Sequence, residues 1–270
     1  MRLTANMRMY GATAEVAALW AALAEWVSRA SGVPLELIAH PPPAPIDTLW
    51  TRPDMGLVLM CGWPFQRAVP SPQIVAAAVP ASPIAEGRAV YWTDMIVAAE
   101  RPARTLADSF GGRIGYTVDG SHSGTNAPRH LLAAHGSTDA QPLYRESVGP
   151  LITPAGAIEA VVRGRCDVAP LDGFFHLLIQ KHDLERAATI RTVARTPVAP
   201  MPPFVAAPGV PPETVAALAE ALCAAHLESE PAALLAALAI ARFTVPDPAD
   251  YALTERWAAD AAARGLTRVQ

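Results

Sequence analysis

The chain has 270 residues, of which 51% are hydrophobic and only 17% are charged, and its net charge is −4. This composition supplies enough apolar residues for a substantial core, which excludes an intrinsically disordered chain. A slightly acidic chain also lacks the basic stripe that nucleic-acid binding requires. We therefore expect a folded protein of one large or two modest domains, without a nucleic-acid partner.

The cysteine pattern and the hydrophobic runs exclude further classes. Cys61, Cys166 and Cys223 form neither a Cys-x-x-Cys pair nor a zinc spacing with histidine, so we expect no disulfide framework, no metal and no cofactor. No run approaches the roughly 18 to 20 apolar residues of a membrane span, so we expect no membrane insertion. Residues 1–10 show no signal-peptide pattern, which is typical of a cytoplasmic protein.

The first third of the chain predicts alternating strands and helices. Leu3–Tyr10 is a candidate strand, and apolar residues at helical spacing predict a helix over residues 12–31. Strands are predicted over Leu35–His40 and Met55–Cys61. The second is continuously apolar, which favours a strand covered on both faces. This order is typical of an α/β protein.

The middle third continues the alternation. Thr153 is expected to cap a helix that begins at Pro154, because threonine is a favoured N-cap and proline suits the first helical turn. The other predicted strands are Val90–Ala98, Arg113–Val118, Cys166–Leu171 and Thr189–Ala194, and the other predicted helices are Ala103–Phe110, Thr125–His135 and Phe174–His182.

The last third is mainly helical. One strand is predicted over Phe204–Ala207. Prolines at the first helical turn then predict helices that begin at Pro211, at Pro231 and near Pro248, the second running through Ile240 and the third through Ala263.

Candidate ligand-binding residues follow the predicted strands. In open α/β sheets, ligands bind beyond the carboxyl ends of the parallel strands. Trp63 and Tyr91 are suited to shape a ligand-binding wall, although a packed aromatic residue would give the same pattern. The residues at these positions are Tyr10, Cys61, Gly62, Trp63, Tyr91, Thr93, Ser121, His122, Ser123, Gly124, Thr125 and Asp172.

The strongest of these candidates is the turn from Ser121 to Asn126. Hydroxyls, a glycine and a helix start bring several backbone N–H donors and positive dipole potential to one point, so an oxyanion can be held without lysine or arginine. His122 can add a donor, or it can be an exposed turn residue. Alternatively, Ser123 or Thr125 simply caps its own helix.

Asp172 is the second strong candidate, because it stands between a buried strand and a helix that begins with two phenylalanines. A carboxylate there can accept a proton-bearing group of a ligand, and it disfavours fully deprotonated anions because two unpaired negative charges are costly. Its alternative role is to cap the following helix.

Signatures of catalysis are weak. The stretch Gly120–Gly124 has the wrong spacing for a Gly-x-Ser-x-Gly nucleophile turn, and Gly111–Gly115 precedes a strand instead of following one, so it is no dinucleotide fingerprint. We therefore assign no catalytic residue and expect a binding protein rather than an enzyme.

Several motifs together resemble the phosphate/phosphonate-type solute-binding proteins of ABC importers. The first is the stretch from Tyr91-Trp92-Thr93-Asp94 to Ala98, followed by Asp119 to Gly124 with its hydroxyl-rich Ser-x-Ser-Gly turn. The second runs from Ala157 through Gly164-Arg165-Cys166-Asp167-Val168-Ala169 to Asp172, and Leu57 to Pro64 is similar to the family's first-lobe strand and loop. The loop Ser147–Pro150 lacks the histidine that phosphonate binders usually carry there.

The resemblance implies a two-lobed α/β fold of the type II periplasmic-binding-protein class, each lobe a mainly parallel sheet flanked by helices and joined by a two-strand hinge. Residues 1–92 and 197–270 would form lobe 1, and residues 93–196 lobe 2. Ser121, Ser123 and Gly124 would donate to an oxyanion and Asp172 would accept, with Tyr10 and Tyr91 as wall residues of an interlobe cleft that closes on its ligand.

Three functions are compatible with this resemblance. In the first, the protein delivers phosphate, phosphonate or a similar small anionic or zwitterionic ligand to an ABC permease, which implies a periplasmic location. In the second, it is a cytoplasmic enzyme on the same fold, similar to menaquinone-pathway lyases or pyrimidine-precursor synthases. In the third, it is a regulatory ligand-sensing domain. A fold alone does not choose among them, because function resides in the site.

Overall fold

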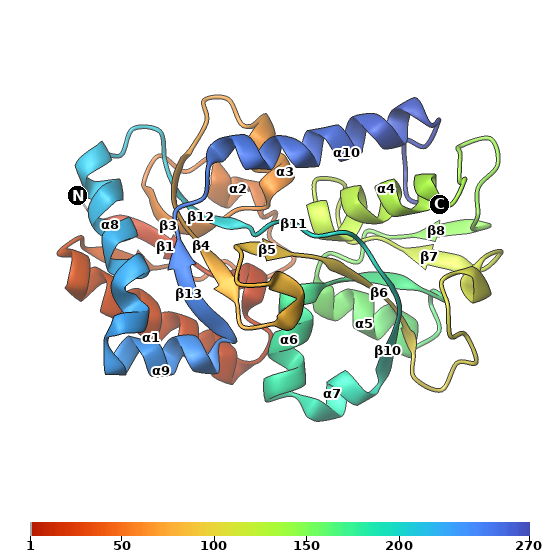
Figure 1. The fold of residues 1–270 in the computed structure, drawn as a ribbon, viewed down its shortest axis with the longest axis horizontal. Helices are drawn as coiled ribbons and strands as arrows, with labels where there is room; N and C mark the ends of the chain where they lie inside the picture. The colour runs from red at the N-terminus through yellow and green to blue at the C-terminus, as the bar shows by residue number, and fades with distance from the viewer. Residues whose placement is uncertain (1) are drawn as a thin grey trace. The chain divides into compact units, whose positions relative to one another are not determined.

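A computed structural model describes residues 2–270, which divide into two compact units (Figure 1). The first unit comprises residues up to Tyr91 together with Pro200–Tyr251, and the second comprises Trp92–Ala199 together with Ala252–Gln270. The chain therefore passes between the units three times. The expected division differs at the end of the chain, because it assigned residues 252–270 to the first lobe.

The first unit is built on a six-stranded mixed sheet in the order β13-β4-β12-β3-β1-β2. Within the sheet, β1 is parallel to both β2 and β3. By contrast, β12 is antiparallel to both β3 and β4, and β13 is antiparallel to β4. Four strands thus run in one direction and two in the other, and only the pairings of β1 with β2 and β3 are parallel, whereas a mainly parallel sheet was expected. The six strands of this sheet are β1 (Leu3–Asn6), β2 (Leu35–Leu37), β3 (Met55–Leu59), β4 (Gln73–Pro80), β12 (Pro203–Ala206) and β13 (Ile240–Thr244). Outside it, β5 (Val90–Tyr91) ends the first stretch of the unit, and β11 (Ala199–Pro200) stands at the boundary in the sequence.

Helices cover this sheet. The longest is α1, which begins after Thr13, whose side chain accepts a hydrogen bond from Val16 N–H at 3.1 Å, and ends at Gly32 in the left-handed conformation. It packs against α8 and α9, and α8 also packs on β4 and β13. The α-helices are α1 (Ala14–Ser31), α2 (Asp47–Trp50), α3 (Gly62–Arg67), α8 (Pro212–Ala224) and α9 (Ser229–Ala237), and the 3-10 turns are η1 (Arg8–Tyr10), η2 (Pro83–Ala85), η5 (Ala225–Leu227) and η6 (Pro248–Tyr251).

The second unit has a three-stranded sheet in the order β10-β6-β9, with β6 antiparallel to both neighbours, which contradicts the mainly parallel sheet expected there. A parallel pair, β7 and β8, joins it through a bridge between Ile114 and Val168, just before β9. The strands are β6 (Thr93–Ala98), β7 (Arg113–Gly115), β8 (Glu146–Val148), β9 (Ala169–Asp172) and β10 (Ile190–Arg195), and the helical segments are η3 (Ala107–Ser109), η4 (His122–Asn126), α4 (Ala127–Ala134), α5 (Pro154–Val162), α6 (Gly173–His182), α7 (Leu184–Ala188) and α10 (Ala252–Ala263).

The last residues join the second unit because they complete its core. α10 packs against α4, and Ala261, Leu266 and Val269 are buried in the same cluster as Met95 and Leu132. Asp139 also receives hydrogen bonds from Thr267 Oγ1 at 2.6 Å and from Gln270 Nε2 at 2.9 Å. Burial of apolar surface and these hydrogen bonds hold the C-terminal segment on this unit.

Several predicted elements differ from the observed ones. The predicted strand Val90–Ala98 is interrupted at Trp92, and the predicted helix Ala103–Phe110 is only the 3-10 turn η3. The helix predicted through Ile240 ends earlier, because Ala239 adopts a positive φ of 55° and the chain continues as β13. By contrast, Thr153 caps α5 as predicted, accepting from Gly156 N–H at 3.0 Å.

Candidate functional site

The turn after Val118 forms a single π-helical turn, η4, that runs directly into α4. Ser121, rather than Ser123 or Thr125, caps it: Ser121 Oγ accepts from Gly124 N–H at 2.9 Å. Thr125 Oγ1 donates to Val118 O at 2.8 Å, which ties the turn to the preceding segment. Two of the expected ligand-binding hydroxyls are therefore engaged in holding the turn.

Gly124 is required at its position by the neighbouring Thr117. A Cβ added to Gly124 would overlap Thr117 Oγ1 and lie 2.8 Å from Thr117 Cβ. The glycine thus lets the turn approach the segment that follows β7 closely, as glycine does where backbone contacts are tight.

Thr93, Ser123 and Asp172 lie together in the second unit. Thr93 opens β6 and is paired in register with Asp172 of β9. Thr93 Oγ1 donates to Ser123 O at 2.9 Å, which joins η4 to the same end of the sheet. The two strongest sequence motifs are therefore brought to one place by residues from three elements.

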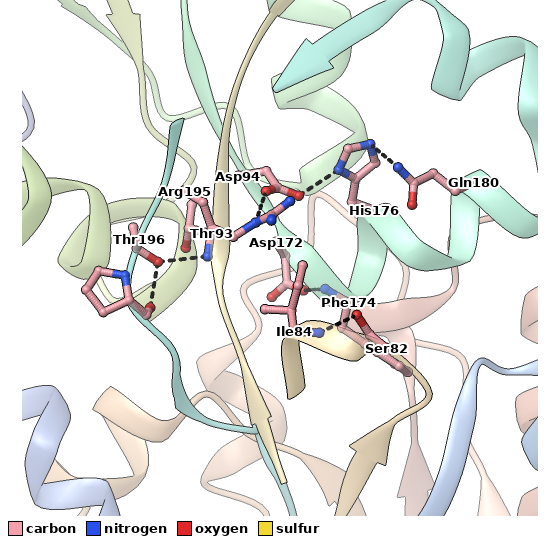
Figure 2. Close-up of polar contacts among 11 residues, drawn as sticks. Ser82, Ile84, Thr93, Asp94, Asp172, Phe174, His176, Gln180, Arg195 and Thr196 are labelled. Carbon is pink, nitrogen blue, oxygen red and sulfur yellow. Dashed lines mark hydrogen bonds and ion pairs between the residues drawn. The ribbon is translucent and has the colours of Figure 1, made fainter. Parts of the chain in front are cut away.

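Asp172 caps α6, as its alternative role predicted. Its Oδ1 accepts from Phe174 N–H at 3.0 Å (Figure 2) and from Phe175 N–H at 3.1 Å. The residue is only 6% exposed. A carboxylate has about four lone-pair positions on two oxygens, so capping through Oδ1 is compatible with a further acceptor role for Oδ2.

His122 is buried and neutral, which contradicts the expectation of an exposed turn residue. It is 1% exposed and stacks on Trp257 of α10 with ring centroids 5.3 Å apart. Burial, with a smaller effect from nearby His130, lowers the pKa of His122 to about 3. Its imidazole thus brings no positive charge to an anion at neutral pH.

Because His122 is buried and neutral, we expect the folded protein to lose stability in acid. In the unfolded chain its pKa returns to about 6.5, so below that pH the unfolded state binds a proton that the folded state refuses. Stability is therefore lost as the pH falls from about 6.5 towards about 3, by up to roughly 1.4 kcal/mol per pH unit from this group. Urea denaturation between about pH 7 and 5 should show a steeper loss for the wild type than for His122→Phe. An imidazole signal of His122 titrating near its ordinary pKa would contradict this expectation.

Asn126 ends the predicted turn and links it to the end of the chain, a role that the sequence did not indicate. Its Nδ2 donates to Thr254 O at 2.8 Å and to His122 Nδ1 at 3.1 Å. Its Oδ1 accepts from Arg129 Nη2 at 3.1 Å, and Arg129 Nη1 donates to Thr267 O at 2.9 Å. Asn126 has no exposed surface, so this network fixes the turn from the side of α10.

A second polar cluster, centred on the buried Asp94, was also not indicated by the sequence. Asp94 Oδ1 accepts from Arg195 Nε at 2.8 Å, and its Oδ2 lies 2.8 Å from His176 Nδ1 (Figure 2). His176 Nε2 lies 3.2 Å from Gln180 Nε2, so both ring nitrogens are engaged. The cluster ties β6 to β10 and α6, and it is a structural clamp rather than a reactive pair.

The remaining candidates belong to the first unit. Tyr10, at the end of η1, is 1% exposed and its carbonyl accepts from Trp20 Nε1 at 3.2 Å. Cys61, Gly62 and Trp63 form the start of α3, where Arg67 lies 5.0 Å from the Trp63 ring centroid. Tyr91 is the last residue of this unit before the chain passes to the second. A ligand role for these five residues stays a prediction.

Residues 2–270 contain neither a metal-binding cluster nor a membrane-spanning helix. No group of three or more histidine, cysteine, aspartate or glutamate side chains is arranged to hold a metal ion. No helix in this part of the chain is both long enough and apolar enough to cross a membrane.

The sequence matches the profile of the family described as ABC transporter, phosphonate, periplasmic substrate-binding protein, over residues 10–251. The chain belongs to this family. The resemblance inferred from the motifs is therefore confirmed, as is the expectation of a transport binding protein rather than an enzyme. Among curated proteins, none has a matching sequence.

Solved structures share the fold. The binding-protein component of an ABC phosphonate transporter from Pseudomonas aeruginosa has a TM-score of 0.81 at 16% identity, covering 97% of this chain and 87% of that one. PhnD1 from Prochlorococcus marinus, in complex with methylphosphonate, has a TM-score of 0.80 at 14% identity, and the match covers 98% of this chain and 99% of the PhnD1 chain. A histidine kinase sensor domain is more distant, with a TM-score of 0.56 at 16% identity, covering 90% of this chain and 97% of that one. These matches give an α/β periplasmic-binding-protein-like fold.

Proposed function

We propose that this phosphonate-family binding protein takes up a small oxyanion of the phosphonate or phosphate type and delivers it to the permease of an ABC importer. The family supports the transport role, and a relative of the same fold has been seen with methylphosphonate. The observation that carries the proposal is the junction of the η4 turn with Asp172 in the second unit.

The η4 turn supplies the donors in this proposal. The first N–H groups of a helical segment have no acceptor within the segment, and its dipole places positive potential at that end. Ser121 holds the Gly124 N–H, and Ser123 stands directly before that glycine, so we assign the ligand oxygens to the turn around Ser123. Backbone donors and a serine hydroxyl suit an oxyanion of either one or two charges.

Asp172 limits which oxyanions bind. A buried carboxylate repels an anion that brings no proton, because neither charge is then compensated. Phosphate, phosphite and phosphonates carry a proton on one oxygen near neutral pH and an aminophosphonate carries an ammonium group, so each offers Asp172 a hydrogen-bond donor. We therefore assign the site to proton-bearing oxyanions and expect sulfate to bind poorly.

Residues of the first unit also contact the ligand in this proposal. By family resemblance, the residues that contact the oxyanion from this unit are Tyr10, Cys61–Trp63 and Tyr91. The two lobes then close about their hinge when the oxyanion binds. A decrease in the radius of gyration in small-angle scattering when ligand is added would support this movement, and an unchanged value would remove it from the proposal.

The ligand class is tested by thermal shift with methylphosphonate, phosphite, phosphate and sulfate. A true ligand at about 100 times its dissociation constant stabilises the folded state by roughly 2.7 kcal/mol. We expect a shift with the first three compounds and little with sulfate. Ser123→Ala should reduce the shift, whereas Ser71→Ala, on the exposed surface of the first unit, should not. Absence of any shift in the wild type, or an equal response to sulfate, would contradict the proposal.

A further inference from the structure

Trp92 carries a buried hydrogen-bond donor that the folded chain leaves unused. The side chain is 2% exposed, and its Nε1 has no hydrogen-bond partner among residues 2–270. Two other indole nitrogens are satisfied: Trp20 Nε1 donates to Tyr10 O at 3.2 Å, and Trp50 Nε1 donates to Leu59 O at 2.9 Å. A buried N–H without an acceptor costs free energy, so its retention calls for an explanation.

The unused donor lies beside the site assigned above. Trp92 O accepts from Gly173 N–H at 2.9 Å, and a Cβ added to Gly173 would overlap Trp92 Nε1 and the adjoining ring atoms. Gly173 directly follows Asp172, and the indole therefore lies against the first residue of α6. The absence of a side chain at position 173 makes room for the indole N–H.

Thr93, which follows Trp92 in the sequence, connects the surroundings of Asp172 to the η4 turn. Thr93 is paired with Asp172 in the sheet and bonded to Ser123 O at 2.9 Å. Trp92 thus stands next to the residue that joins both halves of the site. On the indole ring, the Arg195 guanidinium lies 5.4 Å from the centroid, and Arg195 is itself held by Asp94, so the position of the ring is fixed.

We propose that Trp92 Nε1–H is a ligand-binding and specificity-determining group that donates a hydrogen bond to an oxygen of the bound oxyanion. The inference rests on the proposed function and deepens it. An indole N–H can only donate, whereas Asp172 as a carboxylate can only accept. Side by side they match a ligand that presents a bare oxygen and a proton-bearing group at once, as monoprotonated phosphonate or phosphate does.

The direct test follows the indole N–H signals by NMR in the wild-type protein. The chain has six tryptophans, and their signals are assigned by triple-resonance experiments. On addition of methylphosphonate, and separately of phosphate, the Trp92 signal should move downfield and exchange more slowly with water, because its proton gains an acceptor. The Trp50 signal, whose proton already has an acceptor, should stay in place.

The second test measures affinity in Trp92→Phe, which keeps an aromatic ring but removes the donor together with the five-membered ring of the indole. Loss of a hydrogen bond to a charged group weakens binding about 10- to 100-fold. The melting temperature without ligand should fall only by what the smaller ring costs in packing, because the lost N–H was unsatisfied. Trp50→Phe is the matched control: it loses a satisfied bond, so its stability should fall while its affinity is unchanged.

The outcomes separate this inference from the function on which it rests. If methylphosphonate or phosphate binds the wild type, yet the Trp92 signal stays in place and Trp92→Phe binds equally well, the inference is overturned and the proposed function stands. If neither compound binds the wild type, the proposed function fails and the inference fails with it.

Discussion

Replacing Asp172 with alanine is expected to weaken binding of methylphosphonate or phosphate about 10- to 100-fold, because a charge-assisted hydrogen bond to the protonated ligand group is lost. The same change removes the N-cap of α6, where Oδ1 accepts from two backbone N–H groups, and so should lower the free energy of unfolding by about 1 kcal/mol. Isothermal titration calorimetry and urea denaturation measure the two effects separately.

Asp172→Ser distinguishes the two roles of this residue. Serine is also a favoured N-cap, so this variant should keep most of the stability that alanine loses, yet it has no carboxylate and should bind as weakly as Asp172→Ala. Thr153→Ala provides the matched control, since it removes the cap of α5 in the same unit and should lower stability without changing affinity. Full affinity in Asp172→Ser would show that the carboxylate does not contact the ligand.

The second large effect is expected from Asp94, which stabilises the fold. Asp94 is 2% exposed and binds both Arg195 and His176. Asp94→Ala leaves the buried His176 imidazole N–H without its acceptor, whereas the exposed Arg195 guanidinium can turn to water. The cost should therefore be about 2–3 kcal/mol, below that of breaking a fully buried pair. The free energy of unfolding, measured by urea denaturation without ligand, should fall by that amount.

An exposed ion pair supplies the control for Asp94. Glu159 lies 3.0 Å from Arg163 one helical turn along α5, and both side chains are largely exposed. Glu159→Gln should change stability by less than about 0.5 kcal/mol, because exposed pairs are screened by water. If Asp94→Ala cost no more than Glu159→Gln, the Asp94 cluster would not be the clamp between β6, β10 and α6 described above.

Local signals predicted those elements whose ends are marked by side chains within the same segment. α1 follows its apolar spacing from Thr13 to Gly32, and α5 has Thr153 and Pro154 at its start. The strand β3 follows a continuous apolar run. Caps, glycine stops and apolar runs act over a few residues, so they can be recognised without knowledge of the fold.

Elements without such local signals were missed or misplaced. β4 is rich in alanine, a helix former, and is recognised as a strand only by its place between β12 and β13. β13 follows α9 with no glycine or proline between them, since Ala239 itself takes the positive φ that ends the helix. In both cases pairing with distant strands overrides local propensity.

By itself, the sequence determined the family, the fold class and the two stretches that carry the candidate site, because hydroxyls at a helix start and an acid after a strand are local patterns. Only the tertiary structure decided how that site is built: Ser121 as the cap, a neutral His122 against Trp257, Asn126 bonded to Thr254, and Trp92 against Gly173. Each of these depends on chain segments that meet only in the folded state, or on the exclusion of water from a particular atom. Burial and long-range contact are properties of the packed molecule, and no local pattern specifies them.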